Sequence, residues 1–316
     1  MDLSATIGVA FPATFVLFPK SIGMSPPTVL IDPQMQQSNP FPGGSHLILR
    51  LTDGTSLSLQ IIKPFLPFTK SQVFLVHPEP VGNDLPSELI LKVFDPRYLD
   101  DRIPPPKSNL PSRLWTLEAE TEAAHYRQEI AEGKRPDDFT VDLLYGDEEA
   151  ELYLWEEHFY RLLKESWGSE ADALDRLSPL QGTVIPKFYG SGIVVPPANT
   201  RGIQPLAILM EYIQGTPLAD IEVGTVNLPP SIFCPLLDAV KRFRDLGVFH
   251  SDINAHNVLV SPSEAPTRAV LIDFGCAGVR QDGESEEEWV ANVEFFGDER
   301  SLRRVLDKKG IMGFNG

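Results

Sequence analysis

The stretch that decides the fold comprises residues 249–260, which read FHSDINAHNVLV, and residues 271–275, which read LIDFG. Asp252 and Asn257 are five residues apart, so one tight loop can hold both, and two short adjacent strands would return Asp273 to their side. Taken one at a time, each side chain has an alternative role in an Asx turn or at a strand end. Taken together, they predict one site with two carboxylates and an amide.

The two strings resemble the protein-kinase-like superfamily, because they match its H-x-D-x-x-x-x-N catalytic loop and its D-F-G metal motif in that order. The resemblance implies an α+β, two-lobed fold with a β-rich N-lobe and a shortened, mainly helical C-lobe, which binds ATP and Mg²⁺. It also implies that Asp252 orients and deprotonates an acceptor hydroxyl, while Asn257 and Asp273 bind Mg²⁺ through oxygen atoms. Such a site suits phosphoryl transfer, in which cations stabilise charge that spreads over oxygen atoms.

Before these motifs, period-2 patterns predict β-strands, and the pair Asp53-Gly54 marks the first hairpin turn. Four strands are expected, at residues 46–51, 56–62, 72–77 and 88–94. In the last of them Ile90, Lys92 and Phe94 share one face. Lys92 is either an edge-strand lysine that faces solvent or, by the resemblance, the lysine that holds the α- and β-phosphates of ATP.

Longer apolar periodicities predict helices, with two further strands between them. The helices are expected at residues 117–132, 148–167, 231–246 and 299–309, and the strands at 185–195 and 205–213. By the resemblance, a glutamate on the helix after Lys92 should pair with it. Glu156 is preferred to Glu157 because it adjoins the apolar face of the helix at Trp155, although each carboxylate has the alternative role of a solvated helix side chain.

The string MEYI at residues 210–213 ends a strand about 40 residues before the catalytic loop, and it resembles the hinge between the lobes. Adenine would contact the backbone of Glu211 and Ile213, with Met210 at the back of the pocket. His250 is assigned a structural role beside the D-F-G turn. His256 is either loop filling or a substrate contact, and we favour loop filling.

The chain departs from the family pattern at residues 62–72, where a glycine-rich loop over the nucleotide is expected but no glycine occurs. Close approach of backbone to the phosphates is therefore not expected there. Candidate substitutes are the side chains of Lys63, Thr69, Lys70 and Ser71. Ile90 stands where the family carries a small residue, which narrows the adenine slot. We therefore expect weak nucleotide affinity.

Further departures from the family pattern concern the regulation of activity and the class of phosphoryl acceptor. Ser251 replaces the arginine of the H-R-D form, so control by a phosphorylated activation loop is not expected. Asn254 stands where a serine/threonine protein kinase carries a lysine, which is closer to the aminoglycoside and choline kinase-like branch. Only 41 residues follow Gly275, without an A-P-E string, and this disfavours a conventional peptide kinase. Ser285 and Glu288 predict a capping box there. These features are similar to kinase-like proteins common in fungi.

The amino-acid composition limits the classes of binding partner that the chain can have. Asp and Glu number 44 against 27 Lys and Arg, and the net charge of −17 disfavours nucleic acid and anionic membrane surfaces. The two cysteines, Cys234 and Cys276, indicate a reducing compartment, so we expect an intracellular protein of the cytoplasm or nucleus. Residues 5–18 are apolar but contain Pro12 and follow no basic residue, so neither an export signal nor a membrane span is expected.

We therefore expect an unassigned segment at residues 1–44, an N-lobe with an inserted helix and the hinge at 45–215, and a truncated C-lobe at 216–316. The predicted function is an ATP-dependent phosphotransferase that moves the γ-phosphoryl group of Mg-ATP to a hydroxyl on a protein or a small molecule. The alternative is a pseudokinase that acts as an interaction scaffold with weak or no catalysis, which the glycine-free loop, Ile90 and the short tail favour.

Overall fold

A computed structural model describes residues 41–80, 85–104, 111–145 and 150–311. The chain divides into two units, Met1–Asn39 and Pro40–Gly316, and all the described residues belong to the second. The expectations for residues 1–40 lie outside the described residues. The division into segments 1–44, 45–215 and 216–316 stays a prediction.

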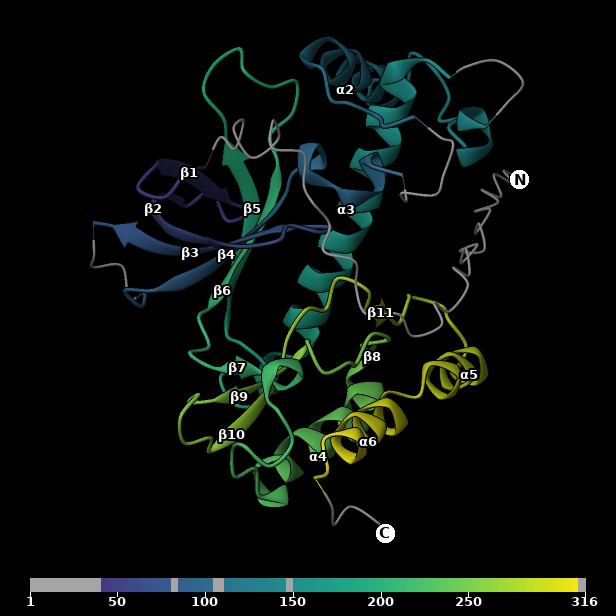
Figure 1. Ribbon diagram of the computed structural model, residues 1–316. Helices are drawn as coiled ribbons and strands as arrows, with labels where there is room; N and C mark the ends of the chain where they lie inside the picture. The colour runs from purple at the N-terminus through teal and green to yellow at the C-terminus, as the bar shows by residue number, and fades with distance from the viewer. Residues whose placement is uncertain (1–40, 81–84, 105–110, 146–149, 312–316) are drawn as a thin grey trace. The chain divides into compact units, whose positions relative to one another are not determined.

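Six antiparallel strands form a closed barrel in the order β1-β2-β3-β4-β6-β5 (Figure 1). Their bounds are β1 (His46–Leu51), β2 (Ser56–Phe65), β3 (Gln72–Glu79), β4 (Leu89–Phe94), β5 (Phe188–Val195) and β6 (Leu206–Glu211). Because successive side chains of a strand point to opposite faces, every second residue enters the barrel. Leu49, Leu59, Phe74, Leu91 and Leu209 fill it and are fully buried. The strands start and stop within three residues of the expected positions.

Two helices, α2 (Leu117–Ala131) and α3 (Leu152–Arg176), follow β4 and pack against each other (Figure 1). Thr116 caps α2 through its Oγ1, which accepts from the backbone N–H of Ala119 at 3.2 Å. The buried Glu157 joins the two helices, because its carboxylate binds both Arg127 at 2.5 Å and Arg161 at 2.6 Å. The expected end of the second helix at residue 167 is wrong, since α3 continues nine residues further.

The rest of the chain surrounds a second hydrophobic core. It contains α4 (Cys234–Phe243), α5 (Glu286–Phe296), α6 (Asp298–Lys308) and the short strands β7 (Thr216–Pro217), β8 (Val248–Phe249), β9 (Val258–Ser261), β10 (Arg268–Leu271) and β11 (Gly278–Val279). Phe243, Phe274 and Leu302 meet in this core. The apolar stripe expected at 231–246 forms α4 with a 3₁₀ turn at either end. Short 3₁₀ helices occupy Pro96–Tyr98, Asp100–Arg102, Val141–Leu144, Ser178–Leu180, Leu218–Asp220, Pro230–Ile232 and Arg244–Leu246.

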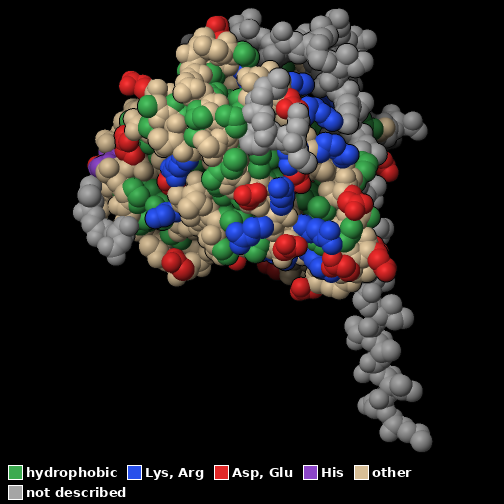
Figure 2. Space-filling model, turned by 90° about the horizontal axis from the view of Figure 1, so that it is seen from below, with side chains coloured by type: hydrophobic (Ala, Val, Ile, Leu, Met, Phe, Trp, Pro, Cys, Tyr) green, Lys and Arg blue, Asp and Glu red, His purple; other side chains and the backbone are tan. Residues whose placement is uncertain are grey.

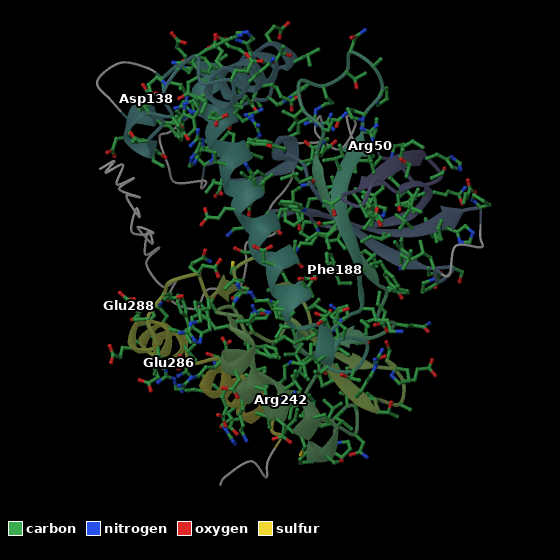
Figure 3. All side chains as sticks on the ribbon, turned by 180° about the vertical axis from the view of Figure 1, so that it is seen from behind. Arg50, Asp138, Phe188, Arg242, Glu286 and Glu288 are labelled. Carbon is green, nitrogen blue, oxygen red and sulfur yellow. The ribbon has the colours of Figure 1, made fainter. Side chains whose placement is uncertain are left out.

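The acidic run before α5 forms the helix start that the sequence predicts. The side chain of Ser285 accepts from the backbone N–H of Glu288, and the Glu288 carboxylate accepts from the backbone N–H of Ser285 in return, which confirms the capping box. Glu286 and Glu288 lie in the first turn (Figure 3). The mixture of strands and helices agrees with the α+β class. In the described part of the chain, no helix is long and apolar enough to span a membrane.

Candidate functional site

Lys92 lies on the outer face of β4 and contacts two carboxylates from distant parts of the chain. The pairing of β4 with β3 and β6 places it opposite Val73 and Ile208, so it is not an edge-strand lysine. Its Nζ donates to Oε2 of Glu170 at 2.5 Å and to Oδ1 of Asp273 at 2.6 Å. Burial by itself would lower the pKa of Lys92, but the two carboxylates outweigh burial and raise it. Lys92 therefore stays protonated.

Glu170, and not Glu156, is the glutamate that pairs with Lys92. Glu156 accepts two hydrogen bonds from the buried guanidinium of Arg102 instead. The two glutamates are 14 residues apart on α3. That spacing is nearly four turns, so they share a face and lie about 21 Å apart along the axis. The prediction of Glu156 was wrong because it ended the helix at Trp167, before the turn that reaches Lys92.

The D-F-G residues form a sharp turn after β10. Asp273 has a φ of 66°, in the left-handed region that is uncommon for residues other than glycine. The ammonium of Lys92 lowers the pKa of Asp273 to about 2, while burial opposes this shift. The Asp273 side chain is 49% exposed, so it remains accessible from solvent. Phe274 anchors the turn, because its ring is buried against those of Phe243 and His250.

Asp252 and Asn257 face each other across one loop, as their spacing predicts. Nδ2 of Asn257 donates to the backbone carbonyl of Asp252 at 2.9 Å and to its Oδ2 at 3.2 Å. Nδ2 of Asn254 donates to the other carboxylate oxygen of Asp252 at 3.1 Å. The backbone carbonyl of Asn257 accepts from the N–H of Ile272 at 2.9 Å. This last bond places the loop beside Asp273, the next residue.

His250 has the structural role that the sequence predicts. The backbone N–H of Asp252 donates to its Nδ1 at 3.3 Å, so its Nε2 carries the proton and donates to the carbonyl of Ile272 at 3.0 Å. Asp298, in the first turn of α6, accepts from the backbone N–H groups of His250 at 2.6 Å and Ser251 at 3.0 Å. Asp298 is buried and is a site-supporting residue that the sequence reasoning missed. Its only sequence signal was an acidic residue before the last expected helix. The side chain of His256 makes no hydrogen bond or ion pair within the described residues.

Backbone groups at the end of β6 and just after it are the predicted contacts for adenine. The N–H of Glu211 donates to the carbonyl of Lys187 at 2.8 Å, and its carboxylate accepts from the N–H of Lys187 at 3.0 Å. Ile213 has a buried side chain, and its backbone makes no hydrogen bond within the described residues. Met210 lies opposite Ile90 on β4. Of the predicted hinge contacts, the backbone of Ile213 is available, whereas the N–H of Glu211 is already used.

The loop between β2 and β3 holds the candidate substitutes for a glycine-rich loop. Lys63, Thr69 and Lys70 are exposed, whereas Ser71 is 8% exposed. The Nζ of Lys63 lies 5.1 Å from the ring centroid of Phe65, so Lys63 already has an aromatic partner.

The available oxygen atoms suit Mg²⁺. Asn257 gives its Nδ2 to Asp252, and its Oδ1 makes no hydrogen bond within the described residues. Asp273 supplies a carboxylate that is half exposed. In the described residues, no group of three or more His, Cys, Asp or Glu is arranged to hold a metal ion. An amide oxygen and a single carboxylate fit Mg²⁺, which is usually held by one or two carboxylates together with substrate phosphates.

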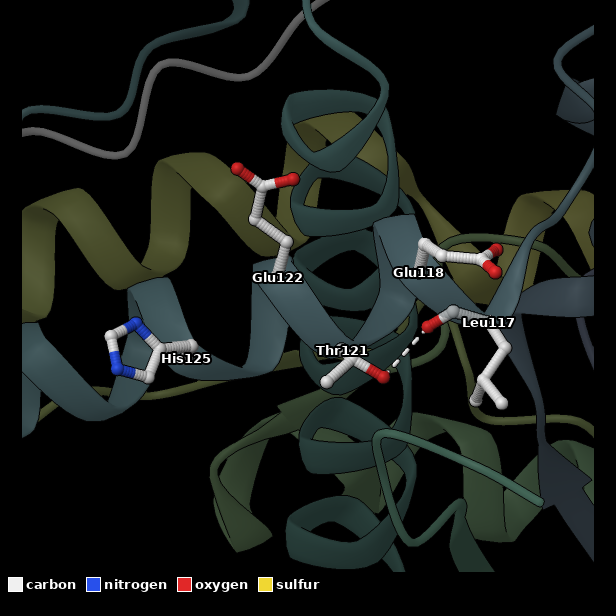
Figure 4. A pocket seen from close by; sticks show the side chains of 5 residues that line it. All are labelled: Leu117, Glu118, Thr121, Glu122 and His125. Carbon is white, nitrogen blue, oxygen red and sulfur yellow. Dashed lines mark hydrogen bonds between the residues drawn. The ribbon is translucent and has the colours of Figure 1, made fainter. Parts of the chain in front are cut away.

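Two surface depressions lie away from these residues. The first, of about 580 Å³, is lined by α2 alone, through Leu117, Glu118, Thr121, Glu122 and His125 (Figure 4). The second, of about 660 Å³, is lined by residues of α4, α5, α6, β8 and the 3₁₀ turn after α4, including Arg244, Arg300 and Glu299. On the face seen from below, Lys and Arg side chains lie among Asp and Glu side chains (Figure 2). Neither depression includes a predicted site residue, so the candidate site is defined by its side-chain contacts.

Comparison with known proteins finds relatives that are named as kinases. The model of the lipopolysaccharide kinase (Kdo/WaaP) family matches residues 226–289, which hold α4, the catalytic loop and the D-F-G turn. A 3-deoxy-D-manno-octulosonic acid kinase of Haemophilus influenzae (strain 86-028NP) is 27% identical over 136 residues, which cover 38% of this chain and 56% of the relative. The serine/threonine-protein kinase pkn2 of Myxococcus xanthus is 28% identical over 111 residues, which cover 32% of this chain and 13% of the relative.

Among solved structures, the kinase domain of Mycobacterium tuberculosis PknI matches with a TM-score of 0.34 and 16% identity, over 69% of this chain and 59% of that one. The chain spans about half the length of the sugar-acid kinase that it matches. The family model and the kinase relatives support a protein-kinase-like superfamily and confirm the resemblance seen in the sequence.

Proposed function

We propose that this chain is an ATP-dependent phosphotransferase that moves the terminal phosphoryl group of Mg-ATP to a hydroxyl of a protein or a small molecule. The observation that carries the proposal is the contact of Lys92 with both Glu170 and Asp273, beside the loop that holds Asp252 and Asn257. It joins a fixed cation, a carboxylate accessible to a metal and a second carboxylate for the acceptor, which phosphoryl transfer requires. The kinase relatives support the same reaction class.

Each side chain then has a role. Lys92 holds the α- and β-phosphates, and Glu170 keeps its ammonium in place. Asp252 accepts the proton of the acceptor hydroxyl as that oxygen attacks. Asn257 and Asp273 would hold Mg²⁺, which would neutralise charge on the phosphate oxygens. The depressed pKa of Asp273 suits this role, because a carboxylate must be ionised to bind a metal.

The same proposal assigns the barrel to an N-lobe at residues 45–215 and the helical part to a C-lobe at 216–316. Adenine would lie at the hinge, where the backbone of Ile213 offers a donor and an acceptor. Both classes of acceptor remain in the proposal, since one relative bears the name of a sugar-acid kinase and another that of a serine/threonine-protein kinase.

The proposal is tested by the formation of ADP from ATP with Mg²⁺. The purified chain is assayed against 3-deoxy-D-manno-octulosonic acid, other small alcohols and a pool of Ser/Thr peptides, with EDTA as the metal-free arm. We expect acceptor-dependent ADP formation that EDTA abolishes, and a fall of about 10²- to 10⁴-fold in Asp252→Ala, which lacks the acceptor's base. The matched control is Asp307→Ala, which removes an exposed carboxylate of α6 and should keep full activity. Equal activity of Asp252→Ala and wild type would refute the role of Asp252.

A pseudokinase scaffold is the second candidate, favoured by the side chain of Ile90. Ile90 lies between Leu75 of β3 and Met210 of β6, and it is partly buried on the face where adenine is proposed to bind. The thermal unfolding midpoint separates the two candidates, because a ligand that binds only the native state raises it. No shift at millimolar Mg-ATP would favour the scaffold.

A further inference from the structure

The loop between β2 and β3 is anchored at both ends of its short turn. Phe68 is 9% exposed, and its ring packs against Phe74 at 5.5 Å and Tyr98 at 5.6 Å between centroids. Ser71, three residues later, is also buried. The residues between them are exposed and include Lys70. A loop anchored in this way holds Lys70 within a small region instead of releasing it as a mobile flap.

Strand pairing places this loop above Lys92. Val73 of β3 lies directly opposite Lys92 of β4, and Lys70 precedes Val73 by three residues. Opposed residues of an antiparallel pair lie on the same face of the sheet, so β3 leads from the loop down the face that carries Lys92. Lys70 therefore starts from the end of the barrel nearest to that ammonium.

The positive charge of Lys70 acts on the Cys276 thiol. Burial raises the pKa of the Cys276 thiol, and the positive charge of Lys70 is the largest effect that opposes burial. Asp252, Asp273 and Lys92 affect the same thiol less strongly. Cys276 follows Asp273 by three residues, so the charge of Lys70 acts on the segment after the D-F-G turn, and it also acts on Asp100 in a 3₁₀ turn after β4.

The site needs such a charge. Glu170 and Asp273 both contact the ammonium of Lys92, Asp252 lies on the neighbouring loop, and the triphosphate of a nucleotide would add more negative charge. Related proteins meet phosphates with backbone N–H groups of a glycine-rich loop, but residues 62–72 contain no glycine. A lysine is a compact point charge that binds phosphate without close backbone approach.

The other candidates in the loop are less suited to this task. The ammonium of Lys63 lies over the ring of Phe65, which itself contacts the ring of Tyr212 at a centroid distance of 6.4 Å. Ser71 is buried. Lys70 forms no ion pair within the described residues, so its charge is available to a ligand.

We propose that Lys70 contacts the terminal phosphate of the bound nucleoside triphosphate and replaces the missing glycine-rich loop. This inference rests on the proposed phosphotransferase function and names a phosphate-binding residue for it. Lys92 holds the inner phosphates, whereas Lys70 reaches the phosphate that lies nearest to Asp252 and Asp273. The chain thus binds the triphosphate with two lysines from the same end of the β3–β4 pair.

Calorimetric titration with ATP, ADP and adenosine tests the proposal on the full chain, with Mg²⁺ present. A hydrogen bond to a charged group is strong enough that Lys70→Ala should weaken ATP binding about 10- to 100-fold. The affinity of this variant for ADP should fall less than its affinity for ATP, and its affinity for adenosine should equal that of the wild type. Lys70→Arg should recover most of the loss. Two controls remove the same charge elsewhere, Lys63→Ala beside the loop and Lys308→Ala on α6. Both variants should bind ATP as the wild type does.

The outcomes separate this inference from the proposed function. If the wild type binds neither ATP nor adenosine, both are overturned. If the wild type binds ATP and Lys70→Ala keeps the same preference for ATP over adenosine, the assignment of Lys70 alone is overturned. If Lys63→Ala, and not Lys70→Ala, loses that preference, the phosphate contact belongs to Lys63.

A second measurement tests the placement of Lys70 without any nucleotide. In a Cys234→Ser background, iodoacetamide labels Cys276, and its rate follows the thiolate fraction. Removal of a nearby positive charge raises the pKa of a thiol, so Lys70→Ala should slow labelling at pH 8. Lys308→Ala should leave the rate unchanged. An equal rate in Lys70→Ala would overturn the placement of Lys70 beside Asp273.

Discussion

Lys92 lies between a carboxylate that is closed to solvent and one that is open to it. The side chain of Glu170 is 1% exposed, whereas that of Asp273 is 49% exposed. An ammonium can be kept in such a buried place only if it is paired. Glu170 therefore contacts Lys92 from the buried side, and Asp273 is the partner that solvent and ligands can reach.

Glu170 and Glu156, two of the buried glutamates of α3, should respond differently to loss of charge. Glu170→Gln leaves Lys92 paired with Asp273, so we expect phosphoryl transfer to fall about tenfold or more while the fold is retained. Glu156→Gln leaves the buried Arg102 without its counter-charge, so we expect a loss of about 3 kcal/mol in the free energy of unfolding. Urea unfolding and ADP formation, measured on both variants, check this. The opposite pattern would return Glu156 to the role that the sequence first gave it.

Asp273 should link stability to pH only in acid. Its pKa falls from an ordinary 3.8 to about 2 in the folded chain, chiefly because of Lys92. A lowered folded-state pKa stabilises the fold above the unfolded-state value, and the effect disappears as the pH falls through the folded-state value. We therefore expect the difference in urea midpoint between wild type and Asp273→Asn to be constant from pH 7 to about pH 4.5 and to shrink below about pH 3.8. A difference that grew on acidification would contradict the ion pair.

Helix α3 continues through a glycine before it reaches Glu170, the buried partner of Lys92. Gly168 lies in the helix interior, and a Cβ at this position would meet nothing within 4 Å. A glycine loses more backbone entropy on folding than alanine does, and no close contact at this position requires a glycine.

Gly168→Ala should therefore stabilise the chain by about 0.5–1 kcal/mol, since alanine has the higher helix propensity. Thermal and urea unfolding measure the change. Gly278→Ala is the matched contrast, because its Cβ would overlap the ring of Phe249 in the β8–β11 pair and should destabilise the chain. A destabilised Gly168→Ala would show that the helix is strained at this point.

At the scale of the whole molecule, the last helix holds the catalytic loop. Asp298 of α6 accepts from the N–H groups of His250 and Ser251, the two residues before Asp252. Segments about fifty positions apart in the sequence are thus joined by one carboxylate.

Asp298→Ala should reduce both stability and turnover. The loss of two hydrogen bonds to a buried carboxylate should cost about 3 kcal/mol of unfolding free energy. ATP affinity should change little, because Asp298 contacts neither Lys92 nor the hinge, whereas turnover should fall as Asp252 loses its position. Glu299→Ala, at the next and more exposed residue, is the control. Unchanged turnover in a folded Asp298→Ala would exclude a positioning role.

The parts of this molecule that were predictable from its sequence are those that local geometry determines. Five residues between Asp252 and Asn257 can close only one small loop, and alternation along β4 dictates that Lys92 shares a face with Ile90 and Phe94. These relations depend on short spacings and strand period alone.

The remaining contacts depend on how distant elements meet. Glu170 follows a helix-breaking glycine, so local propensity ended the helix before it. Asp298 is one acidic residue among many, and only packing of α6 against the loop gives it two backbone partners. Arg102 likewise carried no signal that it would be buried against Glu156. Tertiary packing, which a single sequence does not display, decides each of these.

The barrel has a consequence for how other macromolecules can approach. Because β1 pairs with β5, the six strands form a ring, and within residues 41–80, 85–104, 111–145 and 150–311 this ring offers no open backbone margin. Proteins that recruit peptides by adding a strand need such a margin. A macromolecule that engages the barrel therefore cannot do so by adding a strand to it.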